Sequence, residues 1–285
     1  MPEVRFSPGM CGCLPLIACH HFLMLLLAIA TILLSILLAG CTSPNLSDVY
    51  LLSLSYNTDT NRYSSPYYEP VQYNLNMSRA LTYLAREDGH AHPLEIRAGF
   101  LGLCMKRSTT TSSAYWFCSP HAQVLLDAIK EPGSTITDPL NLIWISQKFK
   151  DRVVFSGLTI ASIPFMLLCF FALSSFPGWD HVISINGENR HIKFSPAKPT
   201  IYTAMFFAWV SSLFVFLAVF GQQVLSSAGV ALINDLSYGT IKAHTGSTAM
   251  GLGWGAMICT LFVFFGVLLM IISIAVLDKK KEDDG

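Results

Sequence analysis

The sequence predicts an α-helical membrane protein: a four-transmembrane-helix bundle with a small disulfide-linked extracellular β-sheet. Three observations lead to this fold class. Of the 285 residues, 52% are hydrophobic and only 13% are charged, whereas soluble domains carry about 25% charged residues. The charges are also absent from four long apolar windows, and two cysteines follow strand-like alternation in a long polar segment.

Four apolar windows are each long enough to cross a bilayer, which takes about 20 residues of helix. They span residues 22–41, 153–176, 201–228 and 249–277, and none contains Asp, Glu, Lys or Arg. A charge at the bilayer centre costs about 3 kcal/mol or more. Windows this long and this free of charge therefore predict transmembrane helices.

The first window has two other interpretations. A signal peptide has an apolar stretch of about 7–15 residues, which is shorter than this window, and Arg5 alone supplies positive charge ahead of it. Residues 38–41 (Leu-Ala-Gly-Cys) resemble the lipidation box of bacterial lipoproteins, which would make Cys41 the mature N-terminus. The three further spans favour a membrane helix. Whether Cys41 is free, paired or lipidated stays open.

Basic residues near the spans predict the orientation, because they favour the cytoplasmic side. Three lie between the second and third windows and three more in the C-terminal tail, whereas the other short loop has only Lys242. Those at 148, 150 and 152 argue the other way, but they end a long segment, and long segments are translocated largely regardless of charge. We therefore expect a multi-pass plasma-membrane protein with both termini in the cytoplasm. The expected order is cytoplasmic N-terminus 1–21, helix 22–41, extracellular domain 42–152, helix 153–176, cytoplasmic loop 177–200, helix 201–228, extracellular loop 229–248, helix 249–277 and cytoplasmic tail 278–285.

The extracellular domain is expected to combine strands with short helices. Apolar and polar residues alternate over 49–56 and 94–103, and a short aromatic stretch covers 114–118. Alternation of this kind is typical of half-buried strands. Helices are expected after capping side chains at three places, and prolines support the last two. The three starts are Ser78, Ser119-Pro120 and Asp138-Pro139, and the last helix is expected to continue into the second transmembrane helix.

The cysteines divide by compartment, and two of them predict a disulfide. Cys104 and Cys118 lie in the extracellular domain, each at the end of a predicted strand. Closing a loop of this size stabilises the fold by about 3 kcal/mol in the loop-entropy model. Cys41, at the membrane boundary, is the reserve partner for either one. Glycosylation sequons at Asn45 and Asn76 fall in the same domain and support its extracellular location.

The sequence does not indicate nucleic-acid binding, catalysis or a metal site. A net charge of zero argues against a nucleic-acid partner. No arrangement of histidines, acids or nucleophiles indicates an enzyme, a small-molecule substrate, a cofactor or a metal site. His90 and His92 lie in an expected loop, and the calcium-loop-like stretch around Asp59 lacks the glycine and glutamate of an EF-hand. The spacing of Gly251 and Gly255 predicts close helix packing in lipid.

One motif carries a family resemblance. Gly99, Gly102 and Cys104, followed by Cys118, form the pattern glycine, two apolar residues, glycine, any residue, cysteine, then a second cysteine. It resembles the signature of the fungal pheromone-induced calcium-regulator and membrane-fusion family of the claudin-like tetraspan superfamily. The four-pass layout and residues 38–43 and 50–56 resemble that family as well. The sequence departs from claudins proper, because no tryptophan precedes the motif and the loop is long. On a strand, the two glycines would let a neighbouring element approach closely, unless they only form a bulge.

The resemblance implies a regulator of calcium influx and of membrane fusion or remodelling during mating or hyphal development. The apolar windows lack the acidic rings typical of cation pores, so a single copy is not expected to be a calcium channel. The bilayer, calcium-channel subunits and a second copy of the chain are the expected partners. The alternative is a claudin-like structural organiser of membrane domains or cell–cell contacts.

Overall fold

The computed structural model describes residues 16–57, 94–109, 112–130, 138–152, 154, 156–175, 181–185, 188–192, 198–237 and 240–283. The chain forms two compact units. One comprises Met1–Ile32, Ala161–Phe216 and Gly255–Gly285, and the other comprises Leu33–Ile160 and Leu217–Trp254. Several expectations fall outside the described residues: the helix after Ser78, the sequon at Asn76, the histidines at 90 and 92, and the stretch around Asp59.

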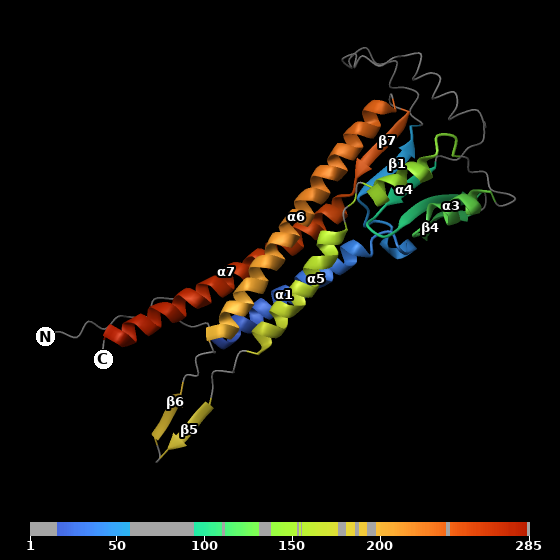
Figure 1. Ribbon diagram of the computed structural model, residues 1–285. Helices are drawn as coiled ribbons and strands as arrows, with labels where there is room; N and C mark the ends of the chain where they lie inside the picture. The colour runs from blue at the N-terminus through green and yellow to red at the C-terminus, as the bar shows by residue number, and fades with distance from the viewer. Residues whose placement is uncertain are drawn as a thin grey trace, which may run out of the picture. The chain divides into compact units, whose positions relative to one another are not determined.

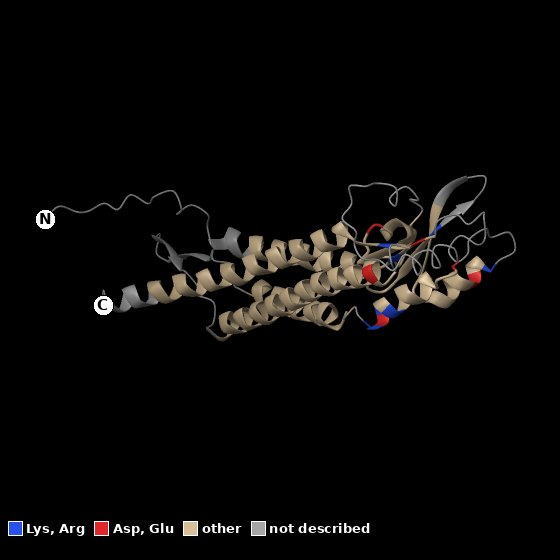
Figure 2. Cartoon of the chain, turned by 90° about the horizontal axis from the view of Figure 1, so that it is seen from above, with Lys and Arg blue, Asp and Glu red and all other residues tan. Residues whose placement is uncertain are grey.

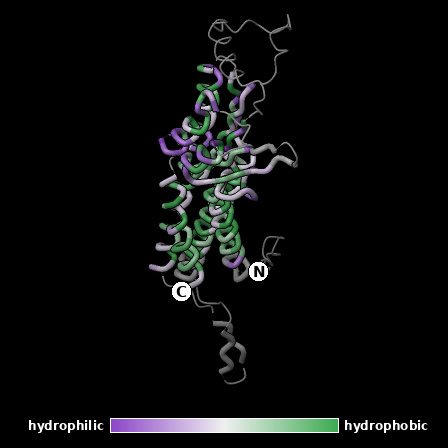
Figure 3. The backbone as a smooth tube through the Cα atoms, turned by 90° about the vertical axis from the view of Figure 1, so that its right-hand side faces the viewer, coloured by the Kyte–Doolittle hydropathy of each residue, from purple (hydrophilic) through white to green (hydrophobic). Residues whose placement is uncertain are grey.

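Four helices are long and apolar enough to span a membrane, as the sequence predicts. They are α1 (Leu16–Leu38), α5 (Gly157–Ser174), α6 (Lys198–Leu236) and α7 (Ser247–Asp283), labelled in Figure 1. Figure 3 shows hydrophobic colouring along these helices, and in Figure 2 they are almost entirely without charge. The chain is therefore a multi-pass membrane protein. The predicted fold class, four such helices with a disulfide-linked sheet, is confirmed.

The helical unit packs through small and aromatic side chains. Gly266 of α7 lies against the side chain of Leu23 in α1, where an added Cβ would stand 2.5 Å from one methyl carbon and 3.1 Å from the other. The ring of Phe165 in α5 meets that of Phe214 in α6 edge to face, with centroids 5.4 Å apart. In the same unit, the loop expected between the second and third spans contains a hairpin of β5 (His181–Ile185) and β6 (Glu188–Ile192).

The other unit contains a five-stranded antiparallel sheet with the order β4-β3-β2-β1-β7. Its strands are β1 (Leu52–Tyr56), β2 (Glu95–Ala98), β3 (Leu103–Thr109), β4 (Ser112–Ser119) and β7 (Ile241–Thr245). Alternate residues such as Leu54, Ile96 and Met105 are fully buried, and each such side chain stabilises the fold by about 1.5–3 kcal/mol. The alternation read from the sequence therefore identified the buried face.

Strand β7 was not expected, because its residues were assigned to a second extracellular loop. It pairs with β1, with Ala243 opposite Leu54. The side-chain amide of Asn234, in the last turn of α6, accepts a hydrogen bond from the Ala243 amide at 2.9 Å and donates to its carbonyl at 3.4 Å. The amide of Asn234 thus takes the place of a neighbouring strand at this sheet edge, where unpaired backbone groups would otherwise remain.

Two short helices, α3 (Ala122–Ile129) and α4 (Leu142–Arg152), complete this unit, and α4 packs on β1 and β2. Figure 2 shows charged residues on these helices and among the strands. Helix α4 begins at Leu142 rather than at Pro139 as predicted, but Asp138 still caps it: its carboxylate accepts hydrogen bonds from the amides of Leu142 and Ile143 at 2.8 and 3.0 Å. Together, the sheet, α3, α4 and the 3₁₀ turn η1 (Pro44–Leu46) are called the sheet domain below.

The expectation that this last helix continues into the second transmembrane helix is wrong. Helix α4 ends at Arg152 and α5 begins at Gly157, with Val154 and Ser156 outside both. The amide of Val154 donates to the Phe149 carbonyl at 3.1 Å, which closes the end of α4. Helix α4 carries basic residues in its last turn, whereas α5 is apolar throughout. The change from a charged helix to an uncharged one therefore falls at the break between them.

Candidate functional site: the glycine turn, the disulfide and Arg97

The glycines of the sequence motif form the connection between β2 and β3. Gly99 donates its amide hydrogen to the Gly102 carbonyl, with N and O 2.9 Å apart, and Ala98 pairs with Leu103 across the antiparallel ladder. The prediction of a single strand over 94–103 is therefore wrong, because the strand ends at Ala98 and the chain reverses. The motif is a tight turn rather than a stretch of strand.

Another segment of the chain lies directly on this turn, which explains the need for glycine. A Cβ at Gly99 would overlap with the carbonyl of Gly40, and a Cβ at Gly102 would overlap with the carbonyl of Cys41 and stand 2.9 Å from the amide nitrogen of Thr42. Real side chains essentially never approach backbone atoms this closely. Residues 40–42, which follow α1, are therefore the neighbouring element whose approach the glycines permit.

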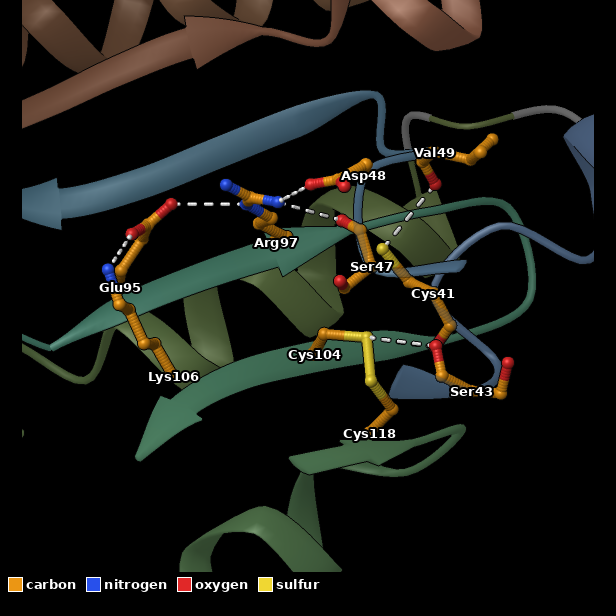
Figure 4. Close-up of polar contacts among 10 residues, drawn as sticks. All are labelled: Cys41, Ser43, Ser47, Asp48, Val49, Glu95, Arg97, Cys104, Lys106 and Cys118. Atoms are coloured by element: carbon orange, nitrogen blue, oxygen red, sulfur yellow. Dashed lines mark hydrogen bonds and ion pairs between the residues drawn. A yellow bond between two sulfur atoms is a disulfide. The ribbon is translucent and has the colours of Figure 1, made fainter. Parts of the chain in front are cut away.

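The disulfide joins directly opposite residues of neighbouring strands. Cys104 of β3 faces Cys118 of β4 in the ladder, and the two are covalently linked with Cα atoms 4.0 Å apart. The Sγ of Cys104 also lies 3.5 Å from the Cys41 carbonyl oxygen, a sulfur–oxygen contact, since no S–H remains. Figure 4 shows this contact. The disulfide and the glycine turn therefore meet the same short segment after α1.

Cys41 is a free, fully buried thiol with a left-handed backbone (φ 58°). Its Sγ donates a hydrogen bond to the Val49 carbonyl at 3.5 Å. Burial raises the pKa of this thiol to about 12, although the nearby Arg97 guanidinium opposes the effect. The thiol therefore stays protonated at physiological pH, and its place in the structure is as a packing group. The alternative disulfide between Cys41 and either Cys104 or Cys118 is therefore not formed.

Arg97 organises the polar face of the sheet, and sequence reasoning missed it. Its guanidinium lies between two rings, 4.7 Å from the centroid of Tyr50 and 4.1 Å from that of Trp116. It also pairs with Asp48 at 2.6 Å and with Glu95 at 3.1 Å, as Figure 4 shows for the two acids. An arginine held between aromatic rings and acids gains cation–π and charge-assisted hydrogen bonds together. The sequence signal for this role was the position of Arg97 on the polar side of the alternating stretch 94–103.

The described acidic residues of the sheet domain are largely engaged in such structural contacts. Glu95 bridges Arg97 and Lys106, whose Nζ lies 3.6 Å from the second carboxylate oxygen. Asp138 caps α4 and also accepts a hydrogen bond from the hydroxyl of Tyr56 at 2.8 Å. Burial, and then the charge of Asp138, raises the pKa of that hydroxyl above its usual range. Within the described part of the chain, no group of three or more His, Cys, Asp or Glu residues is arranged to hold a metal ion.

The remaining predicted site residues are placed as follows. Asn45 is exposed in η1, where its sequon stays a prediction. Gly251 has no heavy atom within 4 Å of a Cβ position, so the close approach between α6 and α7 within the sheet-containing unit is not made there. It is made at Gly253, whose Cβ position lies 3.3 Å from Val219 and 3.4 Å from Gln222. The described residues thus place nothing against Gly251, and packing through Gly255 stays a prediction.

The fold and this site define a four-span membrane protein that carries a disulfide-linked sheet. The family model described as "Ca2+ regulator and membrane fusion protein Fig1" matches residues 82–273, which is more than half of the chain. The chain therefore belongs to this family, and membership implies a role as a Ca²⁺ regulator and membrane fusion protein. No curated protein matches the chain.

Proposed function

We propose that this protein regulates calcium influx and membrane fusion or remodelling at the plasma membrane of a fungus during mating or hyphal development, and that it acts through its sheet domain on the extracellular side. Family membership supports the calcium and fusion roles. The extracellular placement rests on the basic residues at the opposite ends of the spans and on the sequon at Asn45. Both termini are then cytoplasmic.

The observation that carries this proposal is the contact between the segment after α1 and the motif turn. The carbonyls of Gly40 and Cys41 lie against Gly99 and Gly102, with no room for a side chain. Backbone packed against backbone cannot yield as a flexible side chain can. A displacement of the β2–β3 turn by a partner of the sheet domain would therefore move the end of a membrane helix.

A pore through a single copy is not supported by the described helices. Cation filters use rings of acidic side chains or ordered carbonyls. The candidate spans His21–Leu38, Gly157–Ser174 and Ser247–Val276 contain no Asp or Glu, and in α6 the acidic residue Asp235 lies in the last turn. Calcium influx is then controlled through another channel subunit or through assembly of several copies.

The experiment that tests this proposal separates regulation from conduction. Cytosolic calcium is followed with a fluorescent reporter in a deletion strain, with and without the wild-type gene, after contact or pheromone stimulation. The calcium rise should depend on the gene. The purified protein, reconstituted alone in a planar bilayer, should carry little calcium current. A robust calcium-selective current from the pure protein would contradict the regulator proposal.

One observation favours the alternative role as a claudin-like organiser of membrane domains or cell–cell contacts. Strand β4 is the last strand of the sheet order, and Tyr115 on it is 43% exposed. A terminal strand can pair with a strand of another molecule. Normal calcium entry in the deletion strain, together with loss of contact between cells, would favour this role.

A further inference from the structure

A cavity of about 220 Å³ lies within the sheet-containing unit, beside the motif turn. The sheet side contributes Leu51 and Phe100, the latter from the motif itself, and the start of α5 contributes Leu158. The second half of α6 contributes Leu217, Gly221 and Leu225. The lining is therefore mostly apolar, with Gln222 and Ser226 as its polar side chains.

Gly221 leaves this space open. No heavy atom lies within 4 Å of the position that a Cβ at Gly221 would take. Glycine inside a helix costs about 1 kcal/mol relative to alanine, and packing against a neighbour does not explain it here. Apolar cavities of about 150 Å³ stay free of water and bind small hydrocarbons, so a larger one of the same character favours an apolar occupant.

The cavity is continuous with the surface that bilayer hydrocarbon covers. Leu217 and Leu225 line it and are also 43% and 37% exposed. Phe220 and Val224, between them on α6, are about half exposed as well, and all four lie in the candidate span Pro199–Leu236. A lipid chain can therefore enter from the bilayer without crossing water.

One of the polar groups in the lining, Gln222, is buried. Gln222 is only 7% exposed, and its amide nitrogen donates to the Met250 sulfur at 3.8 Å. A thioether is a weak acceptor, and the amide carries two N–H groups. Ligand sites typically combine an apolar lining with a few such polar groups.

We propose that an acyl chain of a bilayer lipid occupies this cavity and contacts Phe100. Phe100 lies between Gly99 and Gly102, the two residues on which the segment after α1 rests. The lipid would thus contact the motif turn through Phe100, and the turn becomes sensitive to the lipid around it. This inference does not depend on the proposed calcium role.

Photolabelling of the full-length protein tests the proposal. The purified chain is reconstituted into phosphatidylcholine vesicles that contain a trace of phosphatidylcholine with a diazirine on its acyl chain, irradiated and mapped by mass spectrometry. Phe100 is only 5% exposed, whereas its neighbour Leu101 is 44% exposed, so fragment-ion mapping must place the label on Phe100 itself, which only a chain inside the cavity should reach. An unlabelled Phe100, with label on the exposed face of α7, would overturn the proposal. Label from a diazirine sterol alone would overturn the assignment to an acyl chain.

A matched pair of variants sharpens the test. Gly221→Leu fills the cavity and should abolish labelling of Phe100 itself, while labelling of α7 around Phe262 persists. Gly251→Leu adds the same side chain where nothing lies within 4 Å and outside the cavity, so labelling should stay at the wild-type level. Undiminished labelling of Phe100 in Gly221→Leu would contradict the proposal. Formation of the disulfide in each variant verifies its fold.

Discussion

The carbonyl of Cys41 lies against the Cα of Gly102, so closely that no side chain fits between them. The two residues belong to the segment after α1 and to the β2–β3 turn, and the disulfide sulfur of Cys104 approaches the same carbonyl at 3.5 Å. One backbone carbonyl thus joins the end of a membrane helix, the glycine turn and the covalent link of the sheet. The predictions below test this arrangement and its surroundings.

Replacing Gly102 with alanine should destabilise the sheet domain, because the new Cβ would overlap with backbone atoms that cannot rotate away. Overpacking of this kind typically costs about 1–3 kcal/mol, and calcium entry should fall as well. Thermal unfolding of the purified variants measures the effect. Gly251→Ala, at a position with open space, should leave stability within about 1 kcal/mol of wild type. Equal stability of the two variants would contradict the role given to Gly102.

Removing the disulfide should destabilise the domain by about 3 kcal/mol. The double substitution Cys104→Ser and Cys118→Ser avoids an unpaired thiol, and both surface delivery and the unfolding midpoint should fall. Peptide mapping of the untreated wild type should find these two cysteines linked. Recovery of both as free thiols would refute the pairing.

The Cys41 thiol should resist alkylation in the folded protein and react once the protein is unfolded. Its pKa is raised to about 12, chiefly by burial, from an ordinary value near 9.0. Because the unfolded thiol loses its proton at lower pH than the folded one, stability should fall as pH rises above about 9. Cys41→Ala should reduce this loss. Mass spectrometry after iodoacetamide treatment at pH 8 measures accessibility, and full labelling of the folded protein would contradict the burial.

Arg97→Lys should destabilise the sheet domain by about 1–3 kcal/mol, because lysine keeps the charge but loses the planar group that stacks between Tyr50 and Trp116 and pairs with two acids. Arg152→Lys, at an exposed position at the end of α4, is the matched control and should have little effect. Chemical denaturation of both variants compares them. Indistinguishable midpoints would mean that the stack contributes nothing measurable.

The extracellular placement of the sheet domain predicts glycosylation at Asn45, which is exposed. Peptide-glycosidase treatment should increase the gel mobility of the wild type, and the shift should become smaller in Asn45→Gln. The same comparison applies to Asn76→Gln. Cleavage of this domain by protease added from the cytoplasmic side would contradict the topology.

Several features could be predicted from the sequence because their causes are local. Hydropathy over about 20 residues indicates a membrane helix wherever its partners lie. Alternation identified the buried side of β1 and β2, and the two cysteines in one polar segment predicted the disulfide. Asp138 was recognised as a cap, because a capping side chain acts on amides a few residues away.

Other features were decided only by the tertiary structure, because they depend on residues far apart in the chain. Strand β7 joins β1 across nearly two hundred positions of sequence, and no local pattern indicates that pairing. The role of Gly102 became evident only when the carbonyl of Cys41 was placed on it. Arg97 likewise gains its stacking partners from strand pairing that brings Trp116 beside it. Local composition determines which segments enter the membrane and which form strands. Contacts between residues far apart in the chain determine the roles of Gly102 and Arg97.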